Sequence, residues 1–204
     1  MNRPLHLSGD VAHLPDAAFG SRSLGWWGVL GFMLIEGIAF VLAAGAYFYL
    51  MPFQQAWPPS SPPPALVYGT LFTAVTLASE IPNVLVKRAA EHHEVRRTRL
   101  LMALMSVLGL VLMGVRALEF TTLNEHWTSN AYGSILWALL VLHTVHVATD
   151  LYDTLVLTVL IWRHEPDTRK LSDVSDNALY WHFVAISWLG IYTLVYWVPR
   201  MTGG

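Results

Sequence analysis

The chain has 204 residues, 54% hydrophobic and only 13% charged, whereas a soluble domain carries about a quarter charged residues, so an integral membrane protein is indicated. The formal net charge of −2 gives no bulk electrostatic basis for binding nucleic acid. The absence of cysteine excludes disulfides, iron–sulfur clusters, thiolate copper centres and haem attached through cysteine, and leaves His, Met, Asp and Glu as candidate metal ligands.

Five apolar segments are long enough to cross a bilayer, which needs about 20 residues per helix. These spans cover approximately residues 26–51, 65–87, 99–118, 131–162 and 178–199. We therefore expect an all-α, polytopic membrane protein with a cytoplasmic tail over residues 1–24. The remaining residues, 25–204, are expected to form one transmembrane domain of five helices.

Lys and Arg residues alternate between successive connections. The tail holds two, the connection after the first span none, the next five, the next none, and the connection before the last span three. Cytoplasmic loops of membrane proteins carry an excess of Lys and Arg. The alternation predicts a cytoplasmic N-terminus and a C-terminus on the outer side.

Ionisable side chains lie inside several spans, where hydrocarbon normally excludes them. Glu36 lies near the middle of the first span, in GFMLIEGIAFVL, with no other ionisable residue within a turn. Because desolvation disfavours a charged carboxylate, we expect Glu36 to be a buried, protonated carboxyl with a proton-related role, unless a partner subunit supplies a cation. Arg116 and Glu119, at the outer end of the third span, have the i, i+3 spacing of an interfacial ion pair.

The fourth span carries four ionisable residues on one helical face, at spacing i, i+3, i+7 and i+10: His143, His146, Asp150 and Asp153. Glu80 in the second span and His182 in the fifth share the cytoplasmic half of the bilayer with them. Three interpretations are open. These groups form a polar seam that joins the helices, or the carboxylates form a proton or ion path, or the histidines ligate haem or a metal.

Several stretches, in this order, resemble subunit III of the haem–copper oxidases, the cytochrome c and quinol oxidase family, in its short five-helix form. They are WGVLGFMLIEGIAFVLAAGAYFYL, WPP, RALEF, NAYGSILWALLVLHTVHV and YWHFVAISWLGIYTLVYW, and the resemblance covers about residues 25–199. The chain also departs from the family pattern. The family often has Asp in place of Ala185 and Gly in place of Asp150, and Glu80 is unusual in its segment. We hypothesise that Asp150 replaces the missing aspartate in function.

The resemblance implies five helices in a V-shaped bundle, two against three, with phospholipid in the cleft. It implies a non-redox accessory subunit in the bacterial cytoplasmic (inner) membrane. This subunit would pack against oxidase subunit I, in a complex with subunit II and others, and support sustained proton-coupled oxygen reduction. Haem and copper are expected in the partner subunits, with no cofactor, metal or catalytic centre in this chain. The polar residues would then join helices, and Glu36 would lie close to subunit I or a lipid.

Other functions remain open at this point. The accessory protein associated with nitric oxide reductases shares the five-helix pattern. A stand-alone haem b membrane protein would use His143 or His146 together with His182. A transporter would bind ions at the carboxylates, although the sequence lacks the paired broken helices of many transporters. The electron donor, cytochrome c or quinol, is determined by other subunits.

Overall fold

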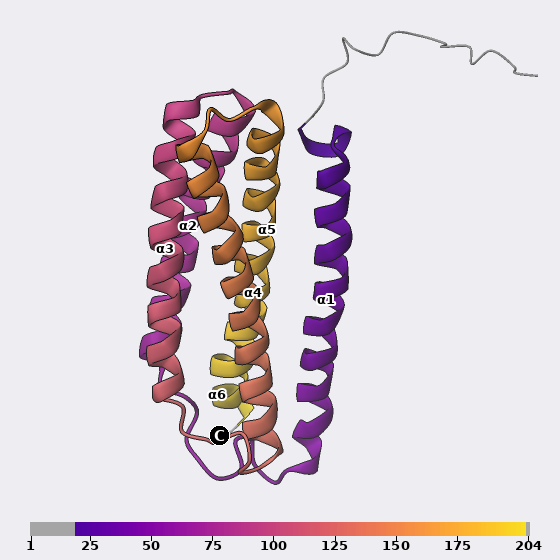
Figure 1. Ribbon diagram of the computed structural model, residues 1–204. Coiled ribbons are helices and arrows are strands. Elements are labelled where there is room, and N and C mark those ends of the chain that lie inside the picture. Colours follow the sequence, from indigo (N-terminus) through magenta and orange to yellow (C-terminus); the bar gives the residue numbers. More distant parts are fainter. Residues whose placement is uncertain (1–18, 203–204) are drawn as a thin grey trace, which may run out of the picture.

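The computed structural model describes residues 19–202, and this part of the chain is built from helices, with no strand (Figure 1). The long helices are α1 (Leu24–Leu50), α2 (Leu66–Glu91), α3 (Val95–Thr121), α4 (Ala131–Arg163) and α5 (Thr168–Tyr192). Shorter pieces are η1 (Gly20–Arg22), η2 (Met51–Phe53), the π-helical turn η3 (Thr193–Trp197) and α6 (Val198–Thr202). Five helices are long and apolar enough to cross a membrane, which confirms the all-α class and the five spans.

Side-chain caps fix where three of the long helices begin. An oxygen of Ser23, Asn130 or Asp167 accepts a hydrogen bond from a backbone N–H in the first turn of α1, α4 or α5, at 3.2, 2.8 and 3.0 Å. Because of the Asp167 cap, α5 begins at Thr168 and not near residue 178 as expected. The polar stretch that precedes the apolar run is therefore a part of the helix.

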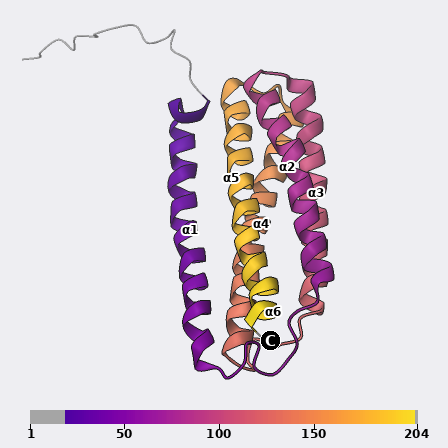
Figure 2. The same cartoon turned by 180° about the vertical axis from the view of Figure 1, so that it is seen from behind.

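Helices α2 to α5 pack around one another, and α1 lies alongside α4 and α5 at one edge (Figures 1 and 2). This grouping of one helix beside four differs from the expected V of two helices against three. The reason is that α2 packs mainly on α3 and α5, whereas α1 packs mainly on α4 and α5. Its buried residues, which include Phe72, Thr76, Ser79 and Asn83, face those helices.

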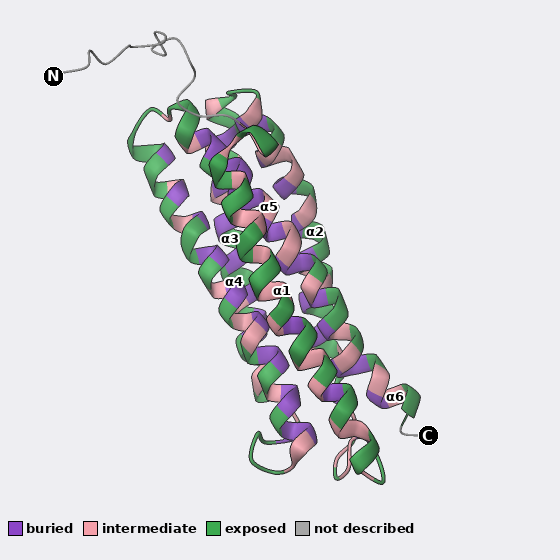
Figure 3. Ribbon diagram, turned by 90° about the vertical axis from the view of Figure 1, so that its right-hand side faces the viewer, coloured by how far each residue is buried: buried purple, intermediate pink, exposed green. Residues whose placement is uncertain are grey.

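The helix α1 is the least covered of the five. Only 6% of its most apolar stretch is buried within the chain, against 33% to 50% for the other spans (Figure 3). Large side chains such as Leu34, Ile35 and Val41 are more than two-thirds exposed. A surface of this kind needs lipid or another membrane subunit to cover it.

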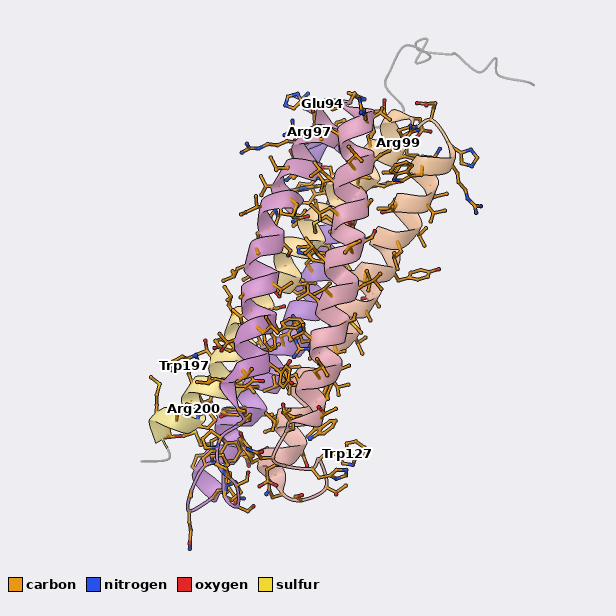
Figure 4. All side chains as sticks on the ribbon, turned by 90° about the vertical axis from the view of Figure 1, so that its left-hand side faces the viewer. Glu94, Arg97, Arg99, Trp127, Trp197 and Arg200 are labelled. Atoms are coloured by element: carbon orange, nitrogen blue, oxygen red, sulfur yellow. The ribbon has the colours of Figure 1, made fainter. Side chains whose placement is uncertain are left out.

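The two ends of the bundle differ in composition. The connections α2–α3 and α4–α5, whose flanking helix turns are rich in Lys and Arg, lie at the same end as the start of α1 (Figure 1). Figure 4 shows Glu94, Arg97 and Arg99 at this end, and Trp127, Trp197 and Arg200 at the opposite end. The antiparallel helices thus gather these basic helix ends on one side, as the charge alternation requires.

Candidate functional site

A buried ion pair lies inside the bundle toward the end that carries Trp127 and Trp197. The Nη1 of Arg116 donates to Oε2 of Glu119 at 2.6 Å, and the other oxygen of Glu119 accepts from the hydroxyl of Tyr196. The two side chains of the pair are only 2% and 1% exposed. The pair is buried within the chain because η3 brings Tyr196 over it, and its expected level at the membrane interface stays a prediction.

Aromatic rings from two other helices enclose the guanidinium of Arg116. Its central carbon lies 3.9 Å from the ring centroid of Phe72 on α2 and 4.2 Å from that of Trp188 on α5. The indole N–H of Trp188 donates to Thr73 on α2 at 2.8 Å. These cation–π contacts let one α3 side chain bind α2 and α5 together.

Both ring nitrogens of His143 take part in this network. The Nδ1 atom accepts a hydrogen bond from Nη2 of Arg116 at 3.1 Å, because a guanidinium can only donate. The Nε2 atom donates to the backbone carbonyl of Val184 at 3.1 Å. His143 is therefore held as a neutral imidazole with no nitrogen free to ligate a haem iron.

Glu36 connects α1 to the rest of the bundle. Its Oε2 accepts a hydrogen bond from the hydroxyl of Tyr180 on α5 at 2.6 Å, and its Oε1 lies 3.3 Å from Nε2 of His146 on α4. The Nδ1 of His146 donates to the carbonyl of Leu142 at 2.6 Å. With Nδ1 fixed as a donor, Glu36 and Nε2 of His146 share one proton position between them.

The contact between α2 and α5 contains a carboxyl–imidazole pair. Nδ1 of His182 bonds to Oε2 of Glu80, and the amide of Asn83 donates to a backbone carbonyl of α5 at 3.0 Å. The indole of Trp181 donates to Ser79 at 2.9 Å. The Glu80 and His182 side chains are 24% and 29% exposed, so this pair lies at the surface of the chain.

Asp150 and Asp153 meet one amide on α5. The Nδ2 of Asn177 donates to Oδ1 of Asp150 at 3.0 Å and to Oδ2 of Asp153 at 3.2 Å. Its Oδ1 accepts from the hydroxyl of Thr154 at 3.2 Å. Asn177 thus holds two neighbouring carboxyl groups together, and neither has a basic side chain as hydrogen-bond partner among residues 19–202.

A cavity of about 380 Å³ opens beside these carboxyl groups, between α1, α4 and α5. Asp150, Asp153, Asp173 and Asp176 all line it. A second, much smaller cavity is lined by Asp150, His143 and Ala185, among others. Asp150 and Ala185 therefore face the same space across the α4–α5 contact.

The predicted stripe on α4 does not form a single cluster. His143 bonds toward α3 and α5, His146 toward α1, and the two aspartates toward α5. Within residues 19–202, no group of three or more His, Asp or Glu side chains is arranged to hold a metal ion.

The structure adds residues that the sequence interpretation missed: Tyr180, Asn177, Asp173, Asp176, Tyr196, Trp188 and Ser79. Four of them belong to the first turns of α5, at spacing 173, 176, 177 and 180, which is one helical face. Extending the fifth span back to Asp167 would have revealed this face. The tyrosine and tryptophan partners have no comparable signal in the sequence. A Tyr or Trp that bonds inside the bundle cannot be distinguished there from one that anchors a helix at the membrane interface.

Comparisons with known proteins agree with one another. A family model described as cytochrome c oxidase subunit III matches residues 20–200. Relatives named cytochrome c oxidase subunit 3 include one from Thermostichus vulcanus, 25% identical over 85% of this chain and 87% of the relative. One from Alkalihalophilus pseudofirmus is 27% identical over 86% of each, and one from Synechocystis is 26% identical over 93% of this chain and 84% of the relative.

Proposed function

The chain belongs to the cytochrome c oxidase subunit III family, and we propose that it serves as the non-redox accessory subunit of a haem–copper terminal oxidase. The match over residues 20–200, which extends into all five spans, carries this proposal. In the proposed complex the chain packs against subunit I, beside subunit II, and it stabilises subunit I during proton-coupled oxygen reduction.

The buried polar groups support a structural role. Arg116, Glu119 and His143 use their polar atoms on one another and on neighbouring helices, and a buried network of this kind fixes one packing arrangement. Haem and copper accordingly belong to the partner subunits. This assignment favours the polar seam over ligation by His143, whose two nitrogens are already hydrogen-bonded.

Two surfaces support contact with a partner subunit. The Glu80–His182 pair is partly exposed about seven residues, or roughly 10 Å, inside Lys87 on α2. Hydrocarbon lipid is a poor environment for such a pair, whereas a protein helix with a hydrogen-bond donor is a good one. The weakly covered α1 offers the second surface, with bound phospholipid as its other cover.

Glu36 is proposed to keep a proton within the complex. Its carboxyl, which shares a proton position with His146, is 15% exposed and lies on the helix with the most exposed surface. A partner helix or lipid beside α1 would cover it. We place the N-terminus in the cytoplasm and the C-terminus outside a bacterial inner membrane, on the charge alternation of the connections.

Sustained turnover tests the proposal. The oxidase is purified from cells with and without this chain, and oxygen consumption is followed until it stops. We expect the same initial rate per haem in both preparations and an earlier loss of activity without the chain. Equal lifetimes would contradict the stabilising role. Failure of the chain to co-purify with any oxidase, together with recovery of a nitric oxide reductase, would establish the alternative complex.

A further inference from the structure

The contact between α2 and α5 reaches the surface of the chain at two levels. Toward the basic end it holds the Glu80–His182 pair, whose side chains are 24% and 29% exposed. Toward the opposite end, the hydroxyl groups of Thr70 and Tyr192 share an exposed hydrogen bond of 2.8 Å. The two contacts are ten residues apart on each helix, about 15 Å at 1.5 Å per residue. Polar groups therefore lie on the outside of the bundle at two depths of the membrane.

One side of α5 is open along this contact. His182, Ile186, Gly190 and Thr193 follow one another at helical spacing, and the last three are exposed. Figure 2 shows α5 between α1 and α2. We use the name outer α2–α5 face for the open residues of α5 together with the two polar contacts: Thr70, Glu80, His182, Ile186, Gly190, Tyr192 and Thr193.

Gly190 has no packing role within the described chain. A Cβ at this position would meet no atom within 4 Å. Glycine inside a helix costs about 1 kcal/mol relative to alanine, whereas between membrane helices a small residue lets the two backbones approach closely. Gly114 on α3 is equally open, but the residues three and four positions from it, at 110, 111, 117 and 118, are all apolar. An open glycine beside polar groups therefore distinguishes the outer α2–α5 face.

The imidazole of His182 has a nitrogen left for a partner. Its contacts with Glu80 and, at 3.4 Å, with the amide of Asn83 both use Nδ1. Nε2 makes no hydrogen bond within residues 19–202, although the ring is partly exposed at a depth where the surroundings are hydrocarbon. Ionisable side chains at such depths normally face protein or water.

The charge of the pair restricts the partner group. With Glu80 ionised, the pair is neutral or carries one negative charge, according to whether His182 is protonated. Within residues 19–202, no Lys or Arg forms an ion pair with Glu80. A carboxylate is therefore an unfavourable partner. A hydroxyl is suitable, because it can donate to Nε2 of a neutral ring and accept from Nε2 of a protonated one.

We propose that the outer α2–α5 face docks a transmembrane helix of the haem-bearing subunit. This helix places a Ser, Thr or Tyr hydroxyl against Nε2 of His182 and passes close to Gly190. Lipid tails are as apolar as leucine, so small residues and interhelical hydrogen bonds, more than apolar contact, select a helix over lipid. Thr70 and Tyr192 give a second polar contact at another depth, which fixes the level of the partner helix. This inference names the docking face for the proposed function and rests on it.

Photo-cross-linking in native membranes tests the docking face. Ile186, which is 69% exposed on the face, or Val107, which is 56% exposed on α3, is replaced by p-benzoylphenylalanine. We expect a cross-link from position 186 to one helix of the haem-bearing subunit, within a helical turn of a hydroxyl side chain, and none from position 107. A cross-link from position 186 to lipid alone, or equal cross-linking from both positions, would overturn the proposal.

A matched pair of glycine substitutions tests the close approach. Gly190→Leu and Gly114→Leu add the same side chain at positions that are open within the chain, so both variants should reach the membrane in equal amounts. A side chain forced into a packed contact is destabilising, so we expect Gly190→Leu to lower the amount of chain retained per haem after a detergent wash about tenfold. Gly114→Leu should leave it unchanged. Equal retention of the two variants would contradict the docking of a helix at Gly190.

The unaltered chain separates the two possible failures. If it co-purifies with no haem–copper subunit, the proposed function is wrong and the docking face with it. If it co-purifies but the large subunit is cross-linked from position 107 and not from position 186, the proposed function stands and the outer α2–α5 face is not the docking surface.

Discussion

The guanidinium of Arg116 on α3 donates a hydrogen bond to Nδ1 of His143 on α4, 3.1 Å away. Since Nε2 of the same ring donates to the carbonyl of Val184 on α5, His143 connects three helices as a neutral side chain. One of the three histidines considered as ligands from the sequence is thereby explained by packing. The predictions below follow from this and the neighbouring contacts.

Removing the cation of the buried pair should destabilise the bundle. In Arg116→Met, Glu119 is left in the core without a cation, and breaking a buried pair in this way costs about 3–5 kcal/mol. Unfolding in a mixed-detergent titration measures the loss. Arg97→Gln is the control, because Arg97 forms an exposed pair with Glu94 at 3.1 Å, for which a change of about 0–1 kcal/mol is expected. Equal effects of both substitutions would show that the buried network does not stabilise the fold.

Replacing histidines should not change the haem content of the complex. His146→Gln and His182→Gln retain hydrogen-bonding ability but remove the imidazole ligand. The haem-to-protein ratio of the purified complex, from its reduced-minus-oxidised spectrum, is expected to match that of the unaltered protein. A haem lost in either variant, with the subunits still assembled, would make that histidine a ligand and revive the haem b alternative.

Glu36 should tolerate the loss of its charge better than the loss of its polar atoms. Glu36→Gln keeps an acceptor for the hydroxyl of Tyr180, whereas Glu36→Ala leaves that hydroxyl without its partner, a loss of about 1–3 kcal/mol. Protease resistance of the connection between α1 and α2 in detergent reports on α1 docking. We expect Glu36→Ala to be cut faster than Glu36→Gln, and the reverse order would contradict the role of Glu36 as a link.

Because Asp150 and Ala185 line the same small cavity, the carboxyl group can be moved from one position to the other. If Asp150 replaces an aspartate missing from α5, then Asp150→Gly should impair assembly or turnover, and adding Ala185→Asp should restore part of it. The two positions line the same small cavity, so a carboxyl placed at 185 reaches the same space. Oxygen consumption per haem is the measurement. Normal assembly and turnover of Asp150→Gly alone would remove the hypothesis.

Several features of the fold were predictable because hydrocarbon imposes strong requirements. Each span needs about 20 apolar residues, and Lys and Arg gather at one end, so the number of spans followed from composition. The start of α5 was not predictable from hydropathy alone, because residues 168–177 are mostly polar and precede the apolar run in the same helix. The Asp167 cap and the buried Leu171 and Val174 decide that start.

The candidate site was predictable only in part. The helical spacing identified His143, His146, Asp150 and Asp153 as one polar face, but spacing cannot say which helix each residue meets. In the structure His143 contacts α3 and α5, His146 contacts α1, and the two aspartates contact α5. The pairing of helices, one beside four, depends on where aromatic side chains such as Phe72 and Trp188 fit, and this is a property of three-dimensional packing.

The most direct test of the central claim is to purify the tagged chain from membranes in mild detergent. A reduced-minus-oxidised spectrum is recorded, and the co-purifying chains are identified by mass spectrometry. The account predicts a large haem–copper subunit together with its haem spectrum, and no haem when the chain is isolated alone. A haem spectrum from the isolated chain, or the absence of any oxidase partner, would contradict it.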